Sequence, residues 1–543
     1  MGTTWRSLRK RKKQNEYGTG INAKVKFAKF NNNLGYNLVL REKQEEYAIW
    51  YEGDSDALLD YYINARTSHV TNRESFRNSN DYFWAVVGRE PEVKCTHSGL
   101  PKEIINTLVR ILGKPKISVS KNIAEDGNLK KIDDVNLTGT VEKIIEDNDF
   151  YSIHSDDQLP YAMVIGDGAY FVNIDLNISE DSPLIEFIDG RNVDFDRQAN
   201  LITAITARKY YIYKDKGYML TDKRSTKIIT DEKNGKKKRI ATVEYHLYEL
   251  VNWSSDEVKE EVALDTIPET KGLESLEYHS INCMLAVPVV YNLDKEAGRG
   301  KSFYAGKLDL CDDLDQSISQ SSLVTKLSTP VDYVPEELLD FDEEGKPKKI
   351  NRYDRRYVVL PGDKNSVGQN TNKIETTQPQ LDFSKYDQNQ LEILMKILTG
   401  LMSPATLGIE LSRKDNATAQ REKEKVTLVT RDSLVDKQTQ ILKKLFNVLL
   451  KVHSYMNGQS TNDNYEITVS YPEYANPTFE NKLAYLAPAY ASGALSEEQY
   501  INELWEDSLS EEEKQNEINA LKERRNSAFQ QYAGGPLDNV MLE

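Results

Sequence analysis

The sequence has no long apolar run in its 543 residues. A membrane-spanning helix needs roughly 18 apolar residues in succession, and the best candidate, 283–293, is shorter and contains Pro288. The basic N-terminus has no apolar stretch behind it, as a secretory signal would require. We therefore expect a protein with no membrane segment.

Cysteine and histidine are also scarce. The three cysteines, Cys95, Cys283 and Cys311, form no CxxC pair, and the six histidines are scattered. This pattern favours a reduced chain without a disulfide framework or a structural zinc site. Cys95 and His97 together supply only two ligands, and two ligands do not make a metal site. We expect neither a metal nor a cofactor.

The sequence has fewer basic residues than acidic residues, so its formal net charge is -16. A protein that holds DNA tightly by its phosphates is normally basic. A conduit in which DNA slides can also have acidic walls, since strong phosphate binding would stall the DNA; the charge alone does not separate such a conduit from an ordinary acidic protein. Hydrophobic residues make up 39% and charged residues 29% of the chain, as in an ordinary folded protein, and the length suits two to four domains.

Catalytic motifs are incomplete. The stretch AGRGKSF at 297–303 resembles a phosphate-binding loop, but Lys295 stands where that loop needs glycine. CDDLDQ at 311–316 resembles a fragment of a magnesium-binding motif without its partner, and we interpret it as an acidic helix surface. No GxSxG or HExxH motif is present. We expect no enzyme and no catalytic residues.

The first half of the chain predicts helices followed by strands. Residues 1–40 form a basic arm, with nine cations and one acid in the first thirty positions; it suits either a contact to nucleic acid or an acidic partner, or a solvated tail. Residues 42–115 are typical of helix, most clearly LPKEIINTLVRILG. Residues 116–251 are typical mostly of strand, and AMVIGDGAYFVNID indicates a hairpin about Gly166–Gly168.

The second half predicts a helix at 302–327, two strands, VDYV and RYVVL, within 330–380, and a helix at 384–402. A loop at 403–415 leads to a helix of about 40 residues ending near Tyr455, which would span about 60 Å. A strand, YEITVSY, and an acidic helical region at 480–530 follow. The fold class is therefore α+β.

Four stretches resemble the portal proteins of long-tailed (siphovirus-type) bacteriophages of Gram-positive hosts, in the same order along the chain. The stretches are HSGLPKEIINTLVRILG; GDGAYFVNID with PLIEFIDGRNVDFD; LMSPATLGIELSRKDNATAQREKEK; and SGALSEEQYINELWEDSLSEEEKQNEINALKERR.

The resemblance implies a portal fold with an α/β wing, two stem helices, a small β-rich clip, a long tunnel helix and a helical crown. It divides the chain as follows: basic N-terminal arm 1–40, wing 41–300 with 460–480 returning to it, stem helix 301–327, clip 328–380, stem helix 381–402, tunnel loop 403–415, long tunnel helix 416–455, crown 481–528 and C-terminal tail 529–543.

The resemblance also implies a function. About twelve copies would form a closed ring at one capsid vertex, the head-tail connector and channel for DNA packaging and DNA ejection. Its partners would be double-stranded DNA, the terminase large subunit, a head-tail adaptor, and the major capsid and scaffolding proteins. The location would be the virion, and the host cytoplasm during assembly. The alternatives are another virion structural protein of the tail or baseplate, and an enzyme of the packaging motor.

Two sets of residues carry the expected contacts. Those of the tunnel loop expected to contact DNA are Leu407, Gly408, Ile409, Leu411, Arg413 and Lys414. Those of the clip expected to dock partner proteins are Glu336, Glu337, Asp342, Glu343, Arg352, Arg355 and Arg356.

Overall fold

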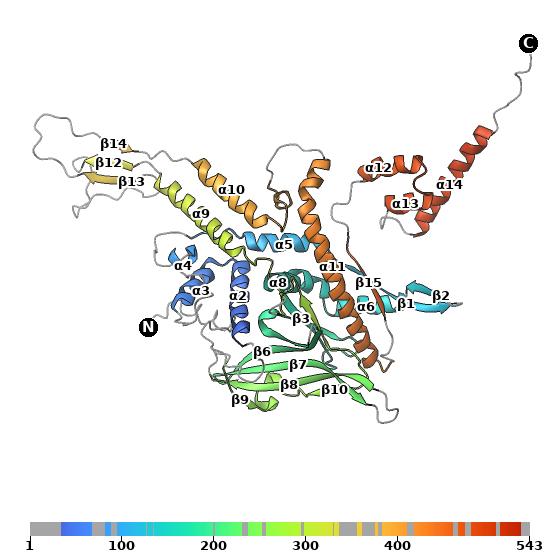
Figure 1. Cartoon of the computed structure of the whole chain (residues 1–543), viewed down its shortest axis with the longest axis horizontal. Helices are drawn as coiled ribbons and strands as arrows, with labels where there is room; N and C mark the ends of the chain where they lie inside the picture. Colours follow the sequence, from blue (N-terminus) through green and yellow to red (C-terminus); the bar gives the residue numbers. More distant parts are fainter. Residues whose placement is uncertain are drawn as a thin grey trace, which may run out of the picture. The chain divides into compact units, whose positions relative to one another are not determined.

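The structure is a computed structural model, which describes residues 34–67, 82–87, 95–125, 128–133, 135–198, 201–230, 237–251, 257–294, 298–328, 331–335, 356–360, 375–377, 383–409, 417–459, 465–472, 479–505 and 511–533. The chain divides into two compact units, Met1–Pro472 and Glu473–Glu543. Helices are combined with mainly antiparallel sheets, so the expected α+β class is confirmed (Figure 1).

The described part of the first unit begins with four helices: α2 (Leu34–Glu52), α3 (Ser55–Thr67), α4 (Phe83–Val87) and α5 (Leu100–Leu112). The predicted apolar stripe of α5 is confirmed, since Ile104, Ile105 and Leu108 are buried. Pro101 stands in its first turn, where no backbone N–H is needed, and Gly113 ends the helix at φ 72°.

A helical segment then interrupts the region predicted as mostly strand. It comprises α6 (Val135–Asp147), α7 (Phe150–Ile153), the π-helical turn η1 (His154–Gln158) and α8 (Leu159–Ile165). The predicted hairpin about Gly166–Gly168 is wrong, because the run Ala162–Ile165 belongs to α8 and Gly166 ends that helix at φ 96°. A short apolar run that is buried on every side shows no periodicity that separates a helix from a strand.

Two antiparallel sheets follow. The smaller has the order β11-β3-β4, from β3 (Asp167–Asn173), β4 (Leu184–Asp189) and β11 (Ala286–Val290). The larger has the order β10-β8-β7-β6-β5, and β9 also pairs with β8. Its strands are β5 (Val193–Gln198), β6 (Leu201–Tyr213), β7 (Lys216–Thr230), β8 (Lys237–Leu250), β9 (Val258–Val262) and β10 (Leu276–Tyr278).

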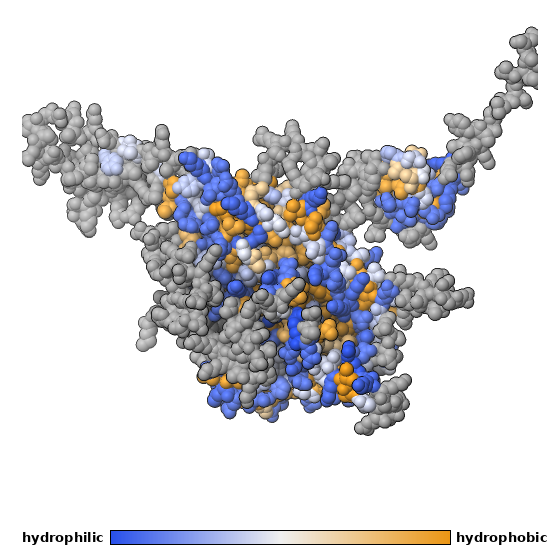
Figure 2. Space-filling view, viewed as in Figure 1, coloured by the Kyte–Doolittle hydropathy of each residue, from blue (hydrophilic) through white to orange (hydrophobic). Residues whose placement is uncertain are grey.

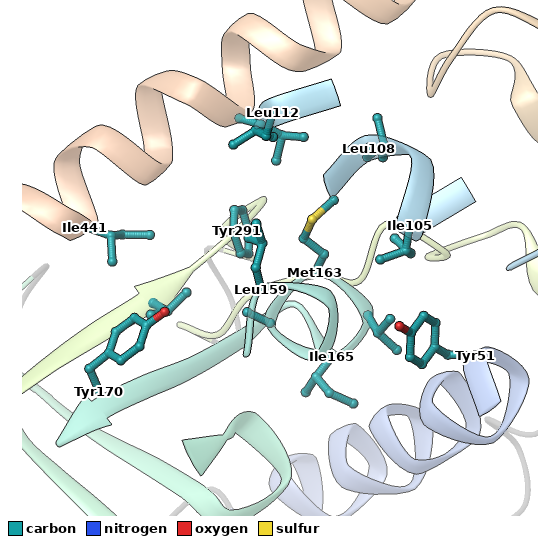
Figure 3. Close-up of a cluster of buried hydrophobic side chains, with 14 of the residues drawn as sticks. Tyr51, Ile105, Leu108, Leu112, Leu159, Met163, Ile165, Tyr170, Tyr291 and Ile441 are labelled. Carbon is teal, nitrogen blue, oxygen red and sulfur yellow. The ribbon is translucent and has the colours of Figure 1, made fainter. Parts of the chain in front are cut away.

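Strand β3 contributes to two cores, because successive side chains of a strand point to opposite faces. Phe171 packs with Phe195 and Ile205 of the larger sheet. Tyr170 belongs instead to the main core, which it shares with residues of α5, α8 and α11, as Figure 3 shows. The smaller sheet therefore lies between the larger sheet and the helices.

A third sheet pairs strands that are far apart in the sequence. Strand β1 (Lys116–Glu125) pairs with β2 (Asn128–Asp133) and, on its other side, with β15 (Glu466–Ser470). The strand predicted from YEITVSY is thus confirmed, and it pairs with a strand some 350 positions earlier, as the register Lys116↔Ser470 shows.

The remaining elements of this unit follow the predicted order. They are α9 (Leu308–Leu327), β12 (Val331–Pro335), β13 (Arg356–Leu360), β14 (Glu375–Thr377), α10 (Phe383–Leu398), the 3-10 turn η6 (Pro404–Leu407) and α11 (Ala417–Met456). The first helix begins at Leu308 rather than at 302, because residues 303–307 form turns. Helix α11 has 40 residues, so the predicted long helix is confirmed to within one residue at each end.

The described part of the second unit contains three helices, α12 (Phe479–Ala491), α13 (Glu497–Trp505) and α14 (Glu511–Ala533). Its small core includes Leu486, Tyr500 and Ile518. Residues 473–543 carry fourteen acids and five cations. The prediction of an acidic helical region at 480–530 is therefore confirmed.

Candidate channel loop, stem helices and docking elements

The described part of the candidate channel loop, 403–409, is a compact turn. The amide of Gly408 donates to the carbonyl of Ala405 at 3.0 Å, and that of Ile409 donates to the carbonyl of Pro404 at 3.1 Å. Gly408 has a φ of 76°, a conformation that costs a residue with a Cβ atom more than it costs glycine. Leu411, Arg413 and Lys414 lie outside the described residues.

This turn is fastened to α11 by one buried hydroxyl group. Thr427 is fully buried, and its Oγ1 accepts the amide of Ser403 at 2.8 Å and lies 2.8 Å from the hydroxyl of Thr406. Leu407 packs against the main core of the same chain, so only part of its side chain is available to a partner. Residues 403–409 of the loop are therefore held against α11.

Lys307 fixes the other end of the turn. Its Nζ donates to the carbonyl of Thr399 at 2.8 Å and to that of Lys396 at 3.3 Å, at the C-terminus of α10. A cation is favoured there because the last carbonyl groups of a helix have no partner within it. Burial lowers the pKa of Lys307. Lys307, just before α9, thereby positions the end of α10.

The long helix α11 changes character along its length. Its C-terminal half is embedded in the main core through Leu442, Leu445 and Phe446, which are fully buried. Nearer its N-terminus Val426 and Val429 are 45% and 63% exposed. One half therefore anchors the helix, and the other half presents apolar side chains at the surface.

The stretch that resembles a phosphate-binding loop is occupied by internal contacts. Arg299 is buried, and its Nε and Nη2 donate to the two carboxylate oxygens of Asp167 at 2.6 and 2.9 Å. The amide of Gly300 donates to Asp167 at 2.9 Å, and Lys301 pairs with Asp294 at 3.2 Å. Burial by itself lowers the pKa of Arg299, but the Asp167 carboxylate more than offsets this, so that pKa lies above its ordinary value.

Close backbone packing explains the glycines around this ion pair. A Cβ atom on Gly300 would lie 1.9 Å from the carbonyl oxygen of Gly166, and one on Gly190 would lie 1.8 Å from Asp167 Oδ1. Ser302 does not cap α9, which begins six residues later; its hydroxyl accepts the amide of Tyr304 at 3.0 Å. This segment joins β11 of the smaller sheet to α9.

The interpretation of 311–316 as an acidic helix surface is wrong for two of its three aspartates. Asp312 accepts the amides of Phe83 at 2.7 Å and Trp84 at 3.4 Å. Asp315 is fully buried, accepts the amide of Ser98 at 2.8 Å, and lies 2.6 Å from His97 Nδ1. Burial raises the pKa of Asp312 to about 7, although the two backbone amides oppose the rise. Both carboxylates attach α9 to the helices before it.

The candidate clip is described only in part. Strand β12 pairs in parallel with β13 and antiparallel with β14, so the predicted strands VDYV and RYVVL are confirmed. Arg356 is the first residue of β13. The other expected docking residues, Glu336, Glu337, Asp342, Glu343, Arg352 and Arg355, lie outside the described residues.

Within the described ranges, no group of three or more histidine, cysteine or acidic side chains is arranged to hold a metal ion. Among the same residues, no helix is both long and apolar enough to cross a membrane.

The contacts that position α9 and α10 were not predicted from the sequence. The sequence gives no sign of the contacts of Arg299 and Lys307, since their partners are distant along the chain or are backbone carbonyls. Thr427 offered a weak signal, because a small polar residue sits one position after Val426 among the apolar residues of α11.

Neither a comparison with protein-family models nor one with curated protein sequences yields a match.

Proposed function

We propose that this chain is a portal subunit of a tailed bacteriophage, one of about twelve copies that form a ring around the channel for DNA packaging and ejection. The observation that carries the proposal is the order of elements: an α+β unit, α9, a three-stranded sheet, α10, the η6 turn and the 40-residue α11. The return of β15 to β1 after the long helix and the separate acidic helical unit support the same assignment.

In this proposal the clip lies between the two stem helices, α9 and α10, and the channel loop follows α10. Lys307 and Thr427 hold residues 399–409 on both sides. The cations of the loop, Arg413 and Lys414, then touch phosphates without reading bases. Contacts of this kind are weak and sensitive to salt, which suits DNA that must pass rather than stay bound.

The clip is proposed to dock the terminase large subunit during packaging and the head-tail adaptor afterwards. Support comes from its position between two helices and from its charges of both signs, such as Glu336 and Arg352. The wing and crown are proposed to face the major capsid and scaffolding proteins.

The decisive experiment is to measure the mass and shape of the purified full-length chain. A closed ring of twelve copies of the 62.1 kDa chain would weigh about 745 kDa. Mass photometry should show this species or a ring of neighbouring stoichiometry, and negative-stain microscopy should show a central hole. A monomer at every protein and salt concentration would contradict the proposal. ATP turnover abolished by Lys301→Ala would favour a packaging-motor enzyme instead.

A further inference from the structure

Helices α10 and α11 each present a pair of apolar side chains at the surface. On α10 these are Leu391 and Met395, which are 39% and 38% exposed. On α11 they are Val426 and Val429, which are 45% and 63% exposed. Spacings of four and three residues place each pair on one face of its helix. Figure 2 shows hydrophobic surface among hydrophilic surface in this part of the molecule.

Both helices already bury another face within the chain. Helix α10 packs on α9, and its Ile397 and Leu398 are almost completely buried. Helix α11 packs on α5, β11 and β15. The exposed pairs therefore belong to a second face of each helix, and a single copy of the chain leaves them partly exposed to water.

Charged residues flank the two pairs in matching order. On α10, Glu392 follows Leu391 and Lys396 follows Met395, and both charged residues are exposed. On α11, the exposed Lys425 precedes Val426, and Asp432 lies one turn after Val429. Asp432 lies 3.7 Å from Arg431 Nη1, yet its side chain remains 73% exposed. In the N- to C-terminal direction, the negative charge therefore comes first on α10, and the positive charge comes first on α11.

This order selects one direction of docking. In a parallel pair with Leu391 opposite Val426 and Met395 opposite Val429, Glu392 comes beside Lys425 and Lys396 comes beside Asp432. The helical repeat places the two charged residues of each helix on one side of its apolar pair. When the two helices are parallel, the charged side of α10 and the charged side of α11 lie along the same edge of the contact. In the antiparallel arrangement the charged sides of the two helices lie on opposite edges of the contact, so neither pair of opposite charges forms.

We propose that the Leu391–Met395 face of α10 docks, parallel, on the Val426–Val429 face of α11 in the next copy of this chain. The contact joins two different surfaces, so it is head-to-tail and can close into a ring. The inference rests on the proposed ring and adds the surfaces that build it. It also places the helix before the channel loop of one copy against the helix after that loop in the neighbour, so that adjacent loops are coupled.

Cysteine cross-linking of the full-length chain tests this contact. Under mild oxidation, the double variant Met395→Cys with Val429→Cys should give a ladder of covalent oligomers, which collapses to monomer on reduction. Each single variant should give no ladder, because the two positions meet only across the interface. The matched control is Met395→Cys with Ile228→Cys, since Ile228 is also exposed, at 61%, but lies on β7; it should give no ladder.

A charge swap provides a second measurement. Exchanging the charges of α10 by Glu392→Lys and Lys396→Glu should raise the protein concentration needed for half assembly by roughly tenfold. Adding Lys425→Glu and Asp432→Lys to the same chain should restore assembly.

The two proposals fail in different ways. Wild-type rings together with no ladder from the double-cysteine variant and no effect of the charge swap would overturn the docking while leaving the ring intact. A ladder that stops at dimers would overturn the head-to-tail arrangement. A wild-type chain that stays monomeric would overturn the proposed function and, with it, the docking.

Discussion

Removing the Asp167 carboxylate should unfold the first unit at markedly lower denaturant concentration. Asp167 is fully buried and accepts hydrogen bonds from Arg299, from the amide of Gly300, and from Gln44 at 3.1 Å. Asp167→Asn preserves the shape of the side chain but replaces one acceptor by a donor, and it leaves the Arg299 charge buried. Removal of one partner from a buried ion pair typically costs about 3–5 kcal/mol.

The structure favours the lower end of that range. After the substitution Arg299 keeps the carbonyl of Gly190 at 2.6 Å and the Asp194 carboxylate at 3.9 Å. A loss of about 3 kcal/mol, with a slope of about 3 kcal/mol per M of urea, lowers the unfolding midpoint by about 1 M. The fluorescence of Trp50 and Trp84, both fully buried in this unit, reports the transition.

The control is Asp196→Asn. Asp196 pairs with Lys223 at 3.3 Å, and its side chain is 41% exposed, so the loss should be below about 1 kcal/mol. Combining Asp167→Asn with Arg299→Met should recover part of the stability, because it removes the unpaired charge. A midpoint shift for Asp167→Asn no larger than that for Asp196→Asn would show that the buried ion pair does not stabilise this unit.

Three further predictions concern pH, the loop anchor and DNA. Burial lowers the pKa of His154 to about 4, so between pH 6.5 and 4 the unfolded chain binds a proton at this residue and the folded chain does not. Up to about 3 kcal/mol of stability is therefore lost as the pH falls from 6.5 to 4. The urea midpoint of the His154→Gln variant should not show this loss. The Thr427→Val variant lacks the hydroxyl that accepts the Ser403 amide. Hydrogen exchange at this amide should become roughly tenfold faster or more. Unchanged exchange would show that the Thr427 hydroxyl is not needed to hold the turn at 403–409. Replacing Arg413 and Lys414 together by serine should leave rings intact but change the retention of packaged DNA; wild-type retention and packaged length would argue against a role of the loop in DNA contact.

Much of the fold followed from local signals. The long helix α11 was predictable because no glycine or proline interrupts 417–456, and α5 because its apolar residues recur at helical spacing before Gly113. Strands β12, β13 and β15 were predictable because each is a short run rich in β-branched or aromatic residues. The order of these elements carries the proposed function, and that order is a property of the sequence.

The sequence was misleading where a local pattern suits two environments. Ala162–Ile165 is equally compatible with a strand or a buried helix, and only its packing within the main core made it part of α8. The aspartates at 312 and 315 read as surface acids, because nothing near them in the sequence shows what they bind.

The sequence by itself therefore determined α5, the elements from α9 to α11 and most strands, since periodicity and chain-breaking residues act over a few positions. The tertiary structure alone decided which charges are buried. Asp312 meets the amide of Phe83 across 229 positions, and Arg299 meets Asp167 across 132. Whether a carboxylate is a solvated surface group or a buried acceptor depends on the free energy of taking it out of water, and the partners that offset this cost are assembled only when the chain folds.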